Sequence, residues 1–274
     1  GNSYQFFTPD MNITASEFML MEQNLFAAMK RNEFMIHYQP YFDIRTRKMI
    51  GAEALLRWQL SDGVIMSPGT FIPVLEKTGM IVEVGERVLR LALSQIRAWQ
   101  KQNLPVVPIA INLSPIQFQQ KNLIATIKGV LNEMQVPPEL LVLEITEGAF
   151  IEDIKYTKTM LEELKNIGVS IAIDDFGTGY SSLSYLKKFP VDRLKIDISF
   201  IREIASDADA ASIVSAIITM ANALHLETIA EGIETEEQLI ILGSLQCNAG
   251  QGYYLQRPMT AEALERMWKQ GQGV

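Results

Sequence analysis

The sequence is poor in the residue types that form disulfides and zinc sites. Its 274 residues include one cysteine, Cys247, and two histidines, His37 and His225. A single cysteine excludes an internal disulfide framework and is most simply a small core residue in a reducing cytoplasm. Both histidines lie in apolar surroundings, where packing is a simpler role than metal binding. A zinc centre is therefore disfavoured.

Long apolar runs and basic runs are also missing. Lys, Arg, Glu or Gly interrupts each apolar stretch before it could span a bilayer, and no secretory pattern is seen. With 24 basic and 32 acidic residues, the chain has a net charge of −8, which argues against nucleic-acid binding through many phosphate contacts. A small anionic ligand remains compatible, because bound metal ions can reverse a local field. We expect a cytoplasmic domain that contacts neither membrane nor nucleic acid.

Apolar runs typical of strands alternate with helical periodicity along most of the chain. A lead-in helix is predicted at 16–31 and a two-stranded hairpin at 34–44 and 49–58. Further strands are predicted at 107–113, 141–145, 169–174, 193–198, 227–230 and 247–250, with helices at 71–78, 84–100, 122–135, 154–166, 181–188, 210–224 and 236–245.

This alternation predicts an α/β fold, a (β/α)8 TIM-type barrel. Repeated βα units with nearly continuous apolar strands indicate a parallel sheet, and about eight strands in roughly 250 residues is the usual size of such a barrel. An open doubly wound sheet is the alternative. It usually has a glycine-rich turn after its first strand, and this sequence has none there.

Polar side chains occur near the carboxyl ends of seven predicted strands. They are Glu53, Asn112, Glu144, the pair Asp174 and Asp175, Lys195, Glu231 and Gln251. In a barrel these ends gather at one mouth, where enzymes of this fold keep their active sites. Each of these polar residues interrupts an apolar run that is otherwise expected to be buried. Solvent-exposed loops therefore explain these positions poorly.

The adjacent aspartates at 174 and 175 are the centre of this pattern. Successive side chains on a strand point to opposite faces, so the two carboxylates are expected to converge only where the strand ends. Two carboxylates at one point repel each other, and a divalent cation removes that repulsion. For the pair taken alone, a solvated Asp-Asp turn is the alternative.

Oxygen ligands without cysteine or histidine select Mg²⁺ or Mn²⁺, or Ca²⁺, over zinc. Two aspartates beside two glutamates and an asparagine can hold two ions, which activate water for in-line displacement at phosphorus. Lys195 has a salt bridge as its alternative role. Near two cations, however, its ammonium form is disfavoured, and it could accept a proton or contact phosphate. With Arg57 available to bind phosphate, the predicted reaction is metal-assisted phosphodiester hydrolysis.

Sequence blocks spread over residues 16–268 resemble the EAL domain family, whose members hydrolyse cyclic di-GMP to linear 5′-pGpG. The signature is Glu53-Ala54-Leu55. The other blocks, in family order, are Tyr38-Gln39-Pro40, residues 71–79, Asn112-Leu113-Ser114, Glu144-Ile145-Thr146-Glu147, residues 174–183, Leu194-Lys195-Ile196-Asp197, residues 230–234 and Gln251-Gly252-Tyr253. The resemblance implies a barrel whose first strand is antiparallel, which suits the predicted hairpin.

The resemblance also implies a role for each matching residue. The metal ligands would be Glu53, Asn112, Glu144, Asp174 and Asp175, holding two Mg²⁺ or Mn²⁺ ions bridged by Asp174, with Ca²⁺ inhibitory. Lys195, Glu53 and Glu231 would be catalytic, and Arg57, Gln39 and Gln251 would contact the substrate. Glu147 would tether the loop of Phe176, Gly177, Thr178 and Gly179, which couples dimerisation to metal binding. A helix N-terminal acid is the alternative for Glu147.

Beyond the site, the resemblance implies a homodimer, formed by residues 180–190 and the helix near Ala210. Residues 4–11 resemble the tail of a GGDEF domain, so residues 1–15 are expected to be a linker or tail of an upstream domain, and 269–274 a C-terminal tail. The parent would be a bacterial signalling protein that affects biofilm formation, cytoplasmic or anchored to a membrane by another segment. Ile198 departs from the family, which commonly has arginine there.

Two other functions are compatible with parts of this pattern. A catalytically silent cyclic di-GMP receptor would have lost metal ligands or the lysine, and this sequence retains them. A glycoside hydrolase barrel would use two carboxylates and would leave Asn112, Asp174, Asp175 and Lys195 without roles.

Overall fold

Eight strands close a barrel, and an antiparallel first strand makes the closure. The computed structural model describes residues 15–150, 153–178 and 186–270, in which the strand order is β1-β9-β8-β7-β6-β5-β4-β2, with β1 pairing again with β2. β1 (Phe34–Asp43) runs antiparallel to both β2 (Met49–Gln59) and β9 (Ala249–Gly250). The other barrel strands, all in parallel pairs, are β4 (Ile109–Leu113), β5 (Leu141–Thr146), β6 (Ser170–Phe176), β7 (Arg193–Ile196) and β8 (Glu227–Ala230). The predicted barrel and its reversed first strand are confirmed.

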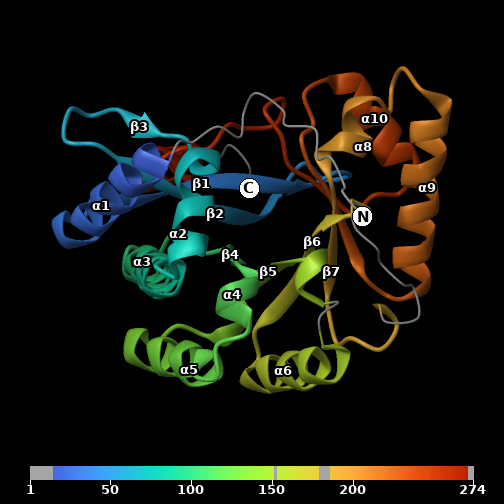
Figure 1. The fold of residues 1–274 in the computed structure, drawn as a ribbon. Coiled ribbons are helices and arrows are strands. Elements are labelled where there is room, and N and C mark those ends of the chain that lie inside the picture. Colours follow the sequence, from blue (N-terminus) through green and yellow to red (C-terminus); the bar gives the residue numbers. More distant parts are fainter. Residues whose placement is uncertain (1–14, 151–152, 179–185, 271–274) are drawn as a thin grey trace.

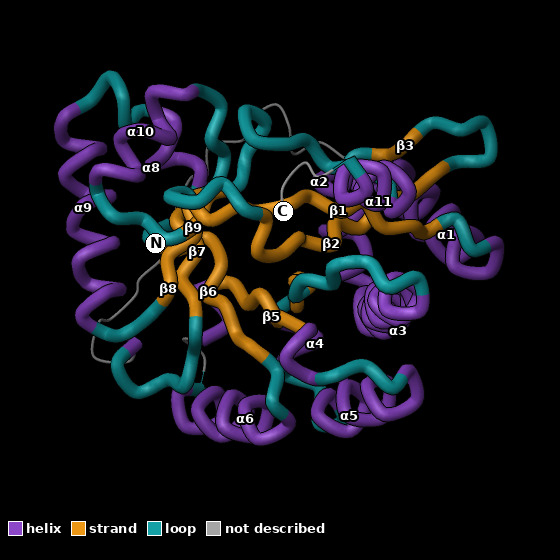
Figure 2. Tube along the Cα trace, turned by 180° about the vertical axis from the view of Figure 1, so that it is seen from behind, coloured by secondary structure: helices purple, strands orange, loops and turns teal. Residues whose placement is uncertain are grey.

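Helices cover the outside of this barrel (Figures 1 and 2). They are α1 (Ala15–Arg31), α2 (Pro68–Thr78), α3 (Ile81–Lys101), α4 (Pro115–Phe118), α5 (Leu123–Met134), α6 (Ile154–Ile167), α8 (Ile198–Arg202), α9 (Ala208–Ala223), α10 (Glu236–Ser244) and α11 (Ala261–Lys269), with 3₁₀ turns η2 (Pro138–Leu140) and η3 (Glu147–Phe150). In α3, buried Val84, Val88 and Leu89 recur at helical spacing, so one face packs on the strands. At its end, the Trp99 ring meets Trp268 of α11 edge-on, with ring centroids 5.0 Å apart.

Most predicted elements are confirmed to within a few residues, and the differences have local causes. Ile198, predicted as the end of a strand, begins α8 instead, because the Asp197 carboxylate accepts a hydrogen bond from the Ser199 N–H at 2.9 Å and caps a helix. The helix predicted at 181–188 lies largely outside the described residues. The short elements β3 (Ile65–Met66), α4 and α8 were not predicted, and neither was the longer helix α11.

The interior of the barrel is filled unevenly, with small side chains on one side and an aromatic ring on the other. Ala110, Val142 and Ala172 form one buried cluster, while Tyr41 packs with Ile229 and Ala249. The Tyr41 hydroxyl accepts a hydrogen bond from Arg193 at 3.2 Å. Because Arg193 begins β7, Tyr41 fills the end of the barrel opposite the mouth.

Tyr41 lies against a glycine, and this contact gives a test of the packing. A Cβ at Gly51 would lie 2.0 Å from the Tyr41 ring, so Gly51→Ala should displace the ring and lower the free energy of unfolding by about 1–3 kcal/mol. Gly129→Ala is the control, since nothing lies within 4 Å of a Cβ there. In helix α5 that change should raise the free energy of unfolding by about 0.5–1 kcal/mol. Urea unfolding of both variants and of the unmodified chain measures these free energies. A Gly51→Ala variant as stable as the unmodified chain would contradict the proposed packing.

Candidate metal-dependent active site

The Lys195 ammonium lies at the centre of the barrel mouth, surrounded by three carboxylates from other strands and by that of Glu231, which directly follows β8. Its Nζ is 2.6 Å from Glu231, 2.9 Å from Glu144, 3.0 Å from Asp174 and 3.5 Å from Glu53. The Lys195 side chain is only 1% exposed. The polar residues predicted at the ends of separate strands are thus brought together by the barrel.

Two amides hold the Glu53 carboxylate in place. Asn112 of β4 donates to Glu53 Oε1 at 2.6 Å, and Gln251, just after β9, donates to Oε2 at 3.0 Å. Gln39 of β1 is the antiparallel partner of Glu53 in the β1–β2 register, and its amide donates to the Gln256 carbonyl at 3.1 Å. The Glu53 carboxylate of β2 therefore links the ends of β4 and β9 through its two hydrogen bonds.

Burial and charge act in opposite directions on the groups of this cluster. Burial, together with the nearby Glu53, raises the pKa of Glu144 well above its ordinary value. Burial alone would lower the pKa of Lys195, but the surrounding carboxylates, Glu144 first, raise it well above normal. For Glu53, burial also raises the pKa, but Lys195 and the two amide hydrogen bonds outweigh it and lower the value. Lys195 is accordingly a firmly held cation in this arrangement.

The two adjacent aspartates converge by a route that the sequence did not predict. The sequence predicts that this strand ends at Asp174, but β6 continues to Phe176 through an irregularity in its pairing with β7. Asp175 has a left-handed backbone, φ 53°, and its N–H donates to Asp174 Oδ1 at 3.1 Å. This conformation costs on the order of 1 kcal/mol for a residue other than glycine. It interrupts the alternation that would otherwise point the two side chains to opposite faces.

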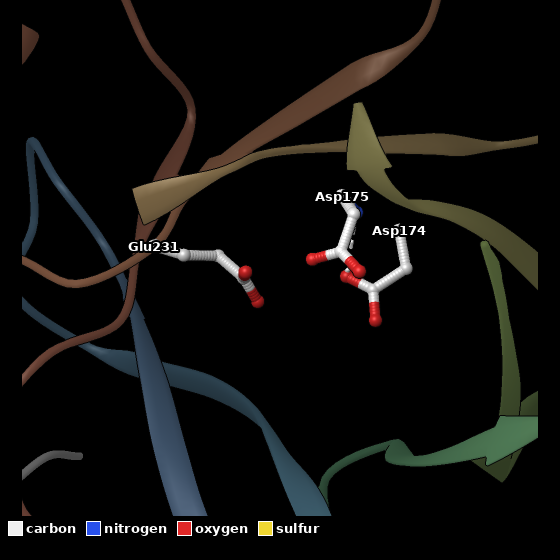
Figure 3. Close-up of side chains that lie close together, drawn as sticks. All are labelled: Asp174, Asp175 and Glu231. Atoms are coloured by element: carbon white, nitrogen blue, oxygen red, sulfur yellow. Dashed lines mark hydrogen bonds between the residues drawn. The ribbon is translucent and has the colours of Figure 1, made fainter. Parts of the chain in front are cut away.

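Figure 3 shows the result: the Asp174 and Asp175 carboxylates, both from β6, face Glu231 across the mouth. One oxygen from each of the three side chains lies within 4.8 Å of the others. Glu231 was predicted as a catalytic residue, and its position beside this pair makes it a candidate ligand as well. The donor set is made of hard oxygens, which fit Mg²⁺ or Mn²⁺.

The predicted residues line two neighbouring pockets at the mouth. A pocket of about 450 Å³ is lined by Gln39, Glu53, Asp174, Lys195, Glu231 and Gln251, together with Ile198, Gly232, Glu234, Gly252 and Tyr253. Arg57 and Asn112 line a second pocket of about 250 Å³ beside α2 and α3. Half burial lowers the pKa of Arg57, although its guanidinium remains a cation.

Several lining residues were not predicted as members of the site. Gly232 and Glu234 follow Glu231 closely, and Tyr253 follows Gln251, so proximity to the predicted residues was the available signal. The Tyr253 ring carries the Arg257 guanidinium 4.1 Å from its centroid. The aromatic face at the rim of the pocket is thus already paired with a cation.

Glu147 contacts the loop that it was predicted to tether. Its Oε2 accepts a hydrogen bond from the Gly177 N–H at 3.0 Å, and its Oε1 is buried without a hydrogen-bond partner among the described residues. Thr178 closes the turn by donating from Oγ1 to the Asp175 carbonyl at 2.9 Å. Phe176 is buried and Gly177 has φ 100°, while Gly179 lies outside the described residues. Glu147 also begins η3, so the helix N-terminal position is observed alongside the tether.

Barrel and mouth together define a (β/α)8 barrel protein with a carboxylate cluster suited to divalent cations. The chain belongs to the EAL domain family, whose model matches residues 22–258. It is 44% identical over 263 residues to the bifunctional diguanylate cyclase/cyclic di-GMP phosphodiesterase MucR of Pseudomonas aeruginosa, covering 96% of this chain and 38% of MucR. The cyclic di-GMP phosphodiesterase NbdA of the same bacterium is 36% identical, with 96% of this chain and 34% of NbdA covered.

Solved structures agree with this assignment. The PaMucR phosphodiesterase in complex with c-di-GMP matches with a TM-score of 0.86 and 44% identity over 89% of this chain and 99% of that chain. The cAMP-bound EAL enzyme Bd1971 matches with a TM-score of 0.87 and 31% identity over 92% of this chain and 71% of that chain. Our chain spans about a third of the length of the curated relatives MucR and NbdA. Within the described residues, no helix has the length and apolar character of a membrane span.

The electrostatics of Glu231 give a pH-dependent prediction for the protein in EDTA. Burial raises the pKa of Glu231 to about 7. The folded state thus binds a proton more tightly than the unfolded state does, and this carboxyl contributes stability below about pH 4.5 that is lost as pH rises through about 7. Urea unfolding at pH 5 and pH 8 should show a loss of up to about 3 kcal/mol from this group. Glu231→Gln should remove that part of the difference.

Glu227→Gln is the matched control, since Glu227 begins the same strand at the other end and pairs with Arg193 at 2.9 Å in a largely exposed position. It should keep the pH dependence of the unmodified protein. An unchanged pH dependence in Glu231→Gln would contradict the raised pKa of Glu231.

Proposed function

We propose that this domain, residues 16–268, hydrolyses cyclic di-GMP to linear 5′-pGpG in a reaction that requires divalent cations. The observation that carries the proposal is the ring of four carboxylates around Lys195, closed by Asn112 and Gln251. Two relatives named as cyclic di-GMP phosphodiesterases, and a phosphodiesterase structure described as a c-di-GMP complex, support the choice of substrate.

The carboxylate cluster offers places for two cations. Glu53, Asn112, Glu144 and Asp174 would hold one, and Asp174, Asp175 and Glu231 would hold the other. Mg²⁺ or Mn²⁺ bound there would supply a Lewis acid for the phosphate and a more acidic water. Ca²⁺, which is larger and accepts looser geometry, is expected to inhibit.

The residues of the chain itself would position the substrate and move the proton. Any positive charge that neutralises the surrounding carboxylates lowers the pKa of Lys195 toward a range in which the amine accepts a proton from water. Arg57 in the neighbouring pocket can donate two parallel hydrogen bonds to a phosphate. Gln39 and Gln251 line the main pocket, where their amides can fix the orientation of the substrate. Glu147 would hold the loop after Asp175 in the active arrangement.

The proposal extends to the protein in its cellular setting. We place it in the cytoplasm, in a larger protein with a GGDEF or sensory domain upstream, where it would lower cyclic di-GMP and affect biofilm formation. MucR, a relative named as bifunctional, supports the linked cyclase domain.

The hydrolysis itself is tested by incubating this chain with cyclic di-GMP in Mg²⁺, Mn²⁺, Ca²⁺ or EDTA and separating the products. Linear pGpG should form in Mg²⁺ or Mn²⁺ only. Lys195→Met should reduce turnover by about 10²–10⁴-fold, because it removes the group that transfers the proton. Glu53→Ala should abolish turnover by removing a metal ligand.

Lys165→Met is the matched control, because Lys165 pairs with Asp192 at 2.7 Å away from the mouth. It should keep turnover near that of the unmodified chain. Tight binding of cyclic di-GMP with no product in any metal would instead identify a receptor domain, and turnover that survives EDTA would contradict the metal requirement.

A homodimer completes the proposal, with its interface at residues 180–190 and α9. Much of that segment lies outside the described residues, while Ile213 of α9 is exposed. Sedimentation of a dilution series should show a dimer that dissociates together with loss of activity. A monomer at all concentrations, with activity unchanged, would exclude coupling through the loop.

A further inference from the structure

Gln238 is a buried glutamine whose side chain joins two segments of the barrel mouth. It is 5% exposed and lies in the first turn of α10. Its Oε1 accepts hydrogen bonds from the N–H groups of Glu234 at 2.7 Å and Thr235 at 3.0 Å. Its Nε2 donates to the carbonyls of Ile201 at 3.1 Å and Arg202 at 3.3 Å. Both polar atoms of the side chain are therefore paired, each with two backbone groups.

These bonds connect α8 to the segment that carries Glu231. Glu234 and Thr235 end the loop that begins at Glu231, whose N–H donates to the Ile196 carbonyl at 3.1 Å. Ile201 and Arg202 are the last residues of α8, where few intrahelical donors remain for the carbonyls. The Ile201 carbonyl also accepts hydrogen bonds from the backbone N–H groups that follow the helix, and the Gln238 amide adds a side-chain donor to it. Helices α8 and α10 lie side by side in both views of the fold (Figures 1 and 2).

Helix α8 also contacts the loop that follows the aspartate pair. A Cβ at Gly177 would lie 2.6 Å from the Phe200 ring, and a Cβ at Gly232 would lie 2.1 Å from Ile198 Cγ1. Both glycines therefore permit close packing of α8, one on each side. One short helix thus separates the Asp175 loop from the Glu231 loop and touches each of them.

We infer that Gln238 is a positioning residue that fixes α8 between these two loops and so sets the spacing of Asp174, Asp175 and Glu231 for the second cation. The inference rests on the proposed function, because it assumes that these carboxylates hold a cation. Gln238 touches none of them. Its effect passes through backbone hydrogen bonds on one side and through the packing of Phe200 and Ile198 on the other.

Two substitutions of Gln238 remove its hydrogen bonds to α8 either alone or together with those to the Glu231 loop. Gln238→Glu keeps an acceptor for the Glu234 and Thr235 N–H groups but loses the donor to the two α8 carbonyls. Gln238→Met loses both and places no charge in the buried site. Calorimetric titration with Mn²⁺ should show two ions on the unmodified chain, and both variants should bind one of them about 10-fold or more weakly, as is usual when support of a ligand is lost.

Thr235→Ala is the matched control. Its hydroxyl accepts a hydrogen bond from the Gln238 N–H at 3.2 Å in the same helix cap, and its removal leaves the Gln238 side-chain bonds to α8 intact. It should lower the melting temperature in the way a lost cap does. Its affinity for both Mn²⁺ ions should stay close to that of the unmodified chain.

Hydrogen exchange on the unmodified chain gives a second measurement that needs no variant to fold. Addition of Mn²⁺ should protect the amides of α8 and of residues 232–235 together. Protection confined to one segment, unchanged Mn²⁺ affinity in both Gln238 variants, or an equal loss in Thr235→Ala would overturn the inference. A chain that binds only one Mn²⁺ would also overturn it, whereas two bound ions without hydrolysis would overturn the proposed function alone.

Discussion

The structure depends on the balance between four negative carboxylates and the single ammonium group that they surround. Four carboxylates at the barrel mouth are close enough to repel one another, and Lys195 is the cation that compensates them. Removing one partner from such a buried ionic cluster leaves charge uncompensated, at a cost of about 3–5 kcal/mol. The residues proposed for the chemistry are therefore also those whose charges must be balanced for the strand ends to pack together at the barrel mouth.

The same balance of charge determines how the pocket meets an anionic ligand. Its lining includes Glu53, Asp174, Glu231 and Glu234. Lys195, the one cation among the described residues that line it, is already shared among carboxylates. A phosphodiester approaching this surface meets negative charge unless divalent cations reverse the field. Arg57 lies outside this lining, in the adjacent pocket, and cannot neutralise the cluster alone.

The sequence was sufficient to predict the barrel and the members of the cluster, because both depend on patterns that are local. Apolar runs interrupted by Glu144 or Lys195 mark strand ends without knowledge of their neighbours. The left-handed conformation of Asp175 could not be predicted, since it depends on the irregular pairing of β6 with β7. The contacts of Gln238 with residues 36 and 37 positions earlier were equally inaccessible, because no periodicity links them. What the sequence lacked was the three-dimensional register between segments.

The reversed direction of β1 determines where the segment that precedes it in the chain meets the barrel. In a barrel with all strands parallel, the chain enters the first strand from the face opposite the active site. Here β1 runs the other way, so α1 delivers the chain to the rim of the mouth, and Gln39 of the main pocket follows only five residues after Phe34. One continuous strand thus joins the end of α1 to the pocket wall, without crossing the barrel interior.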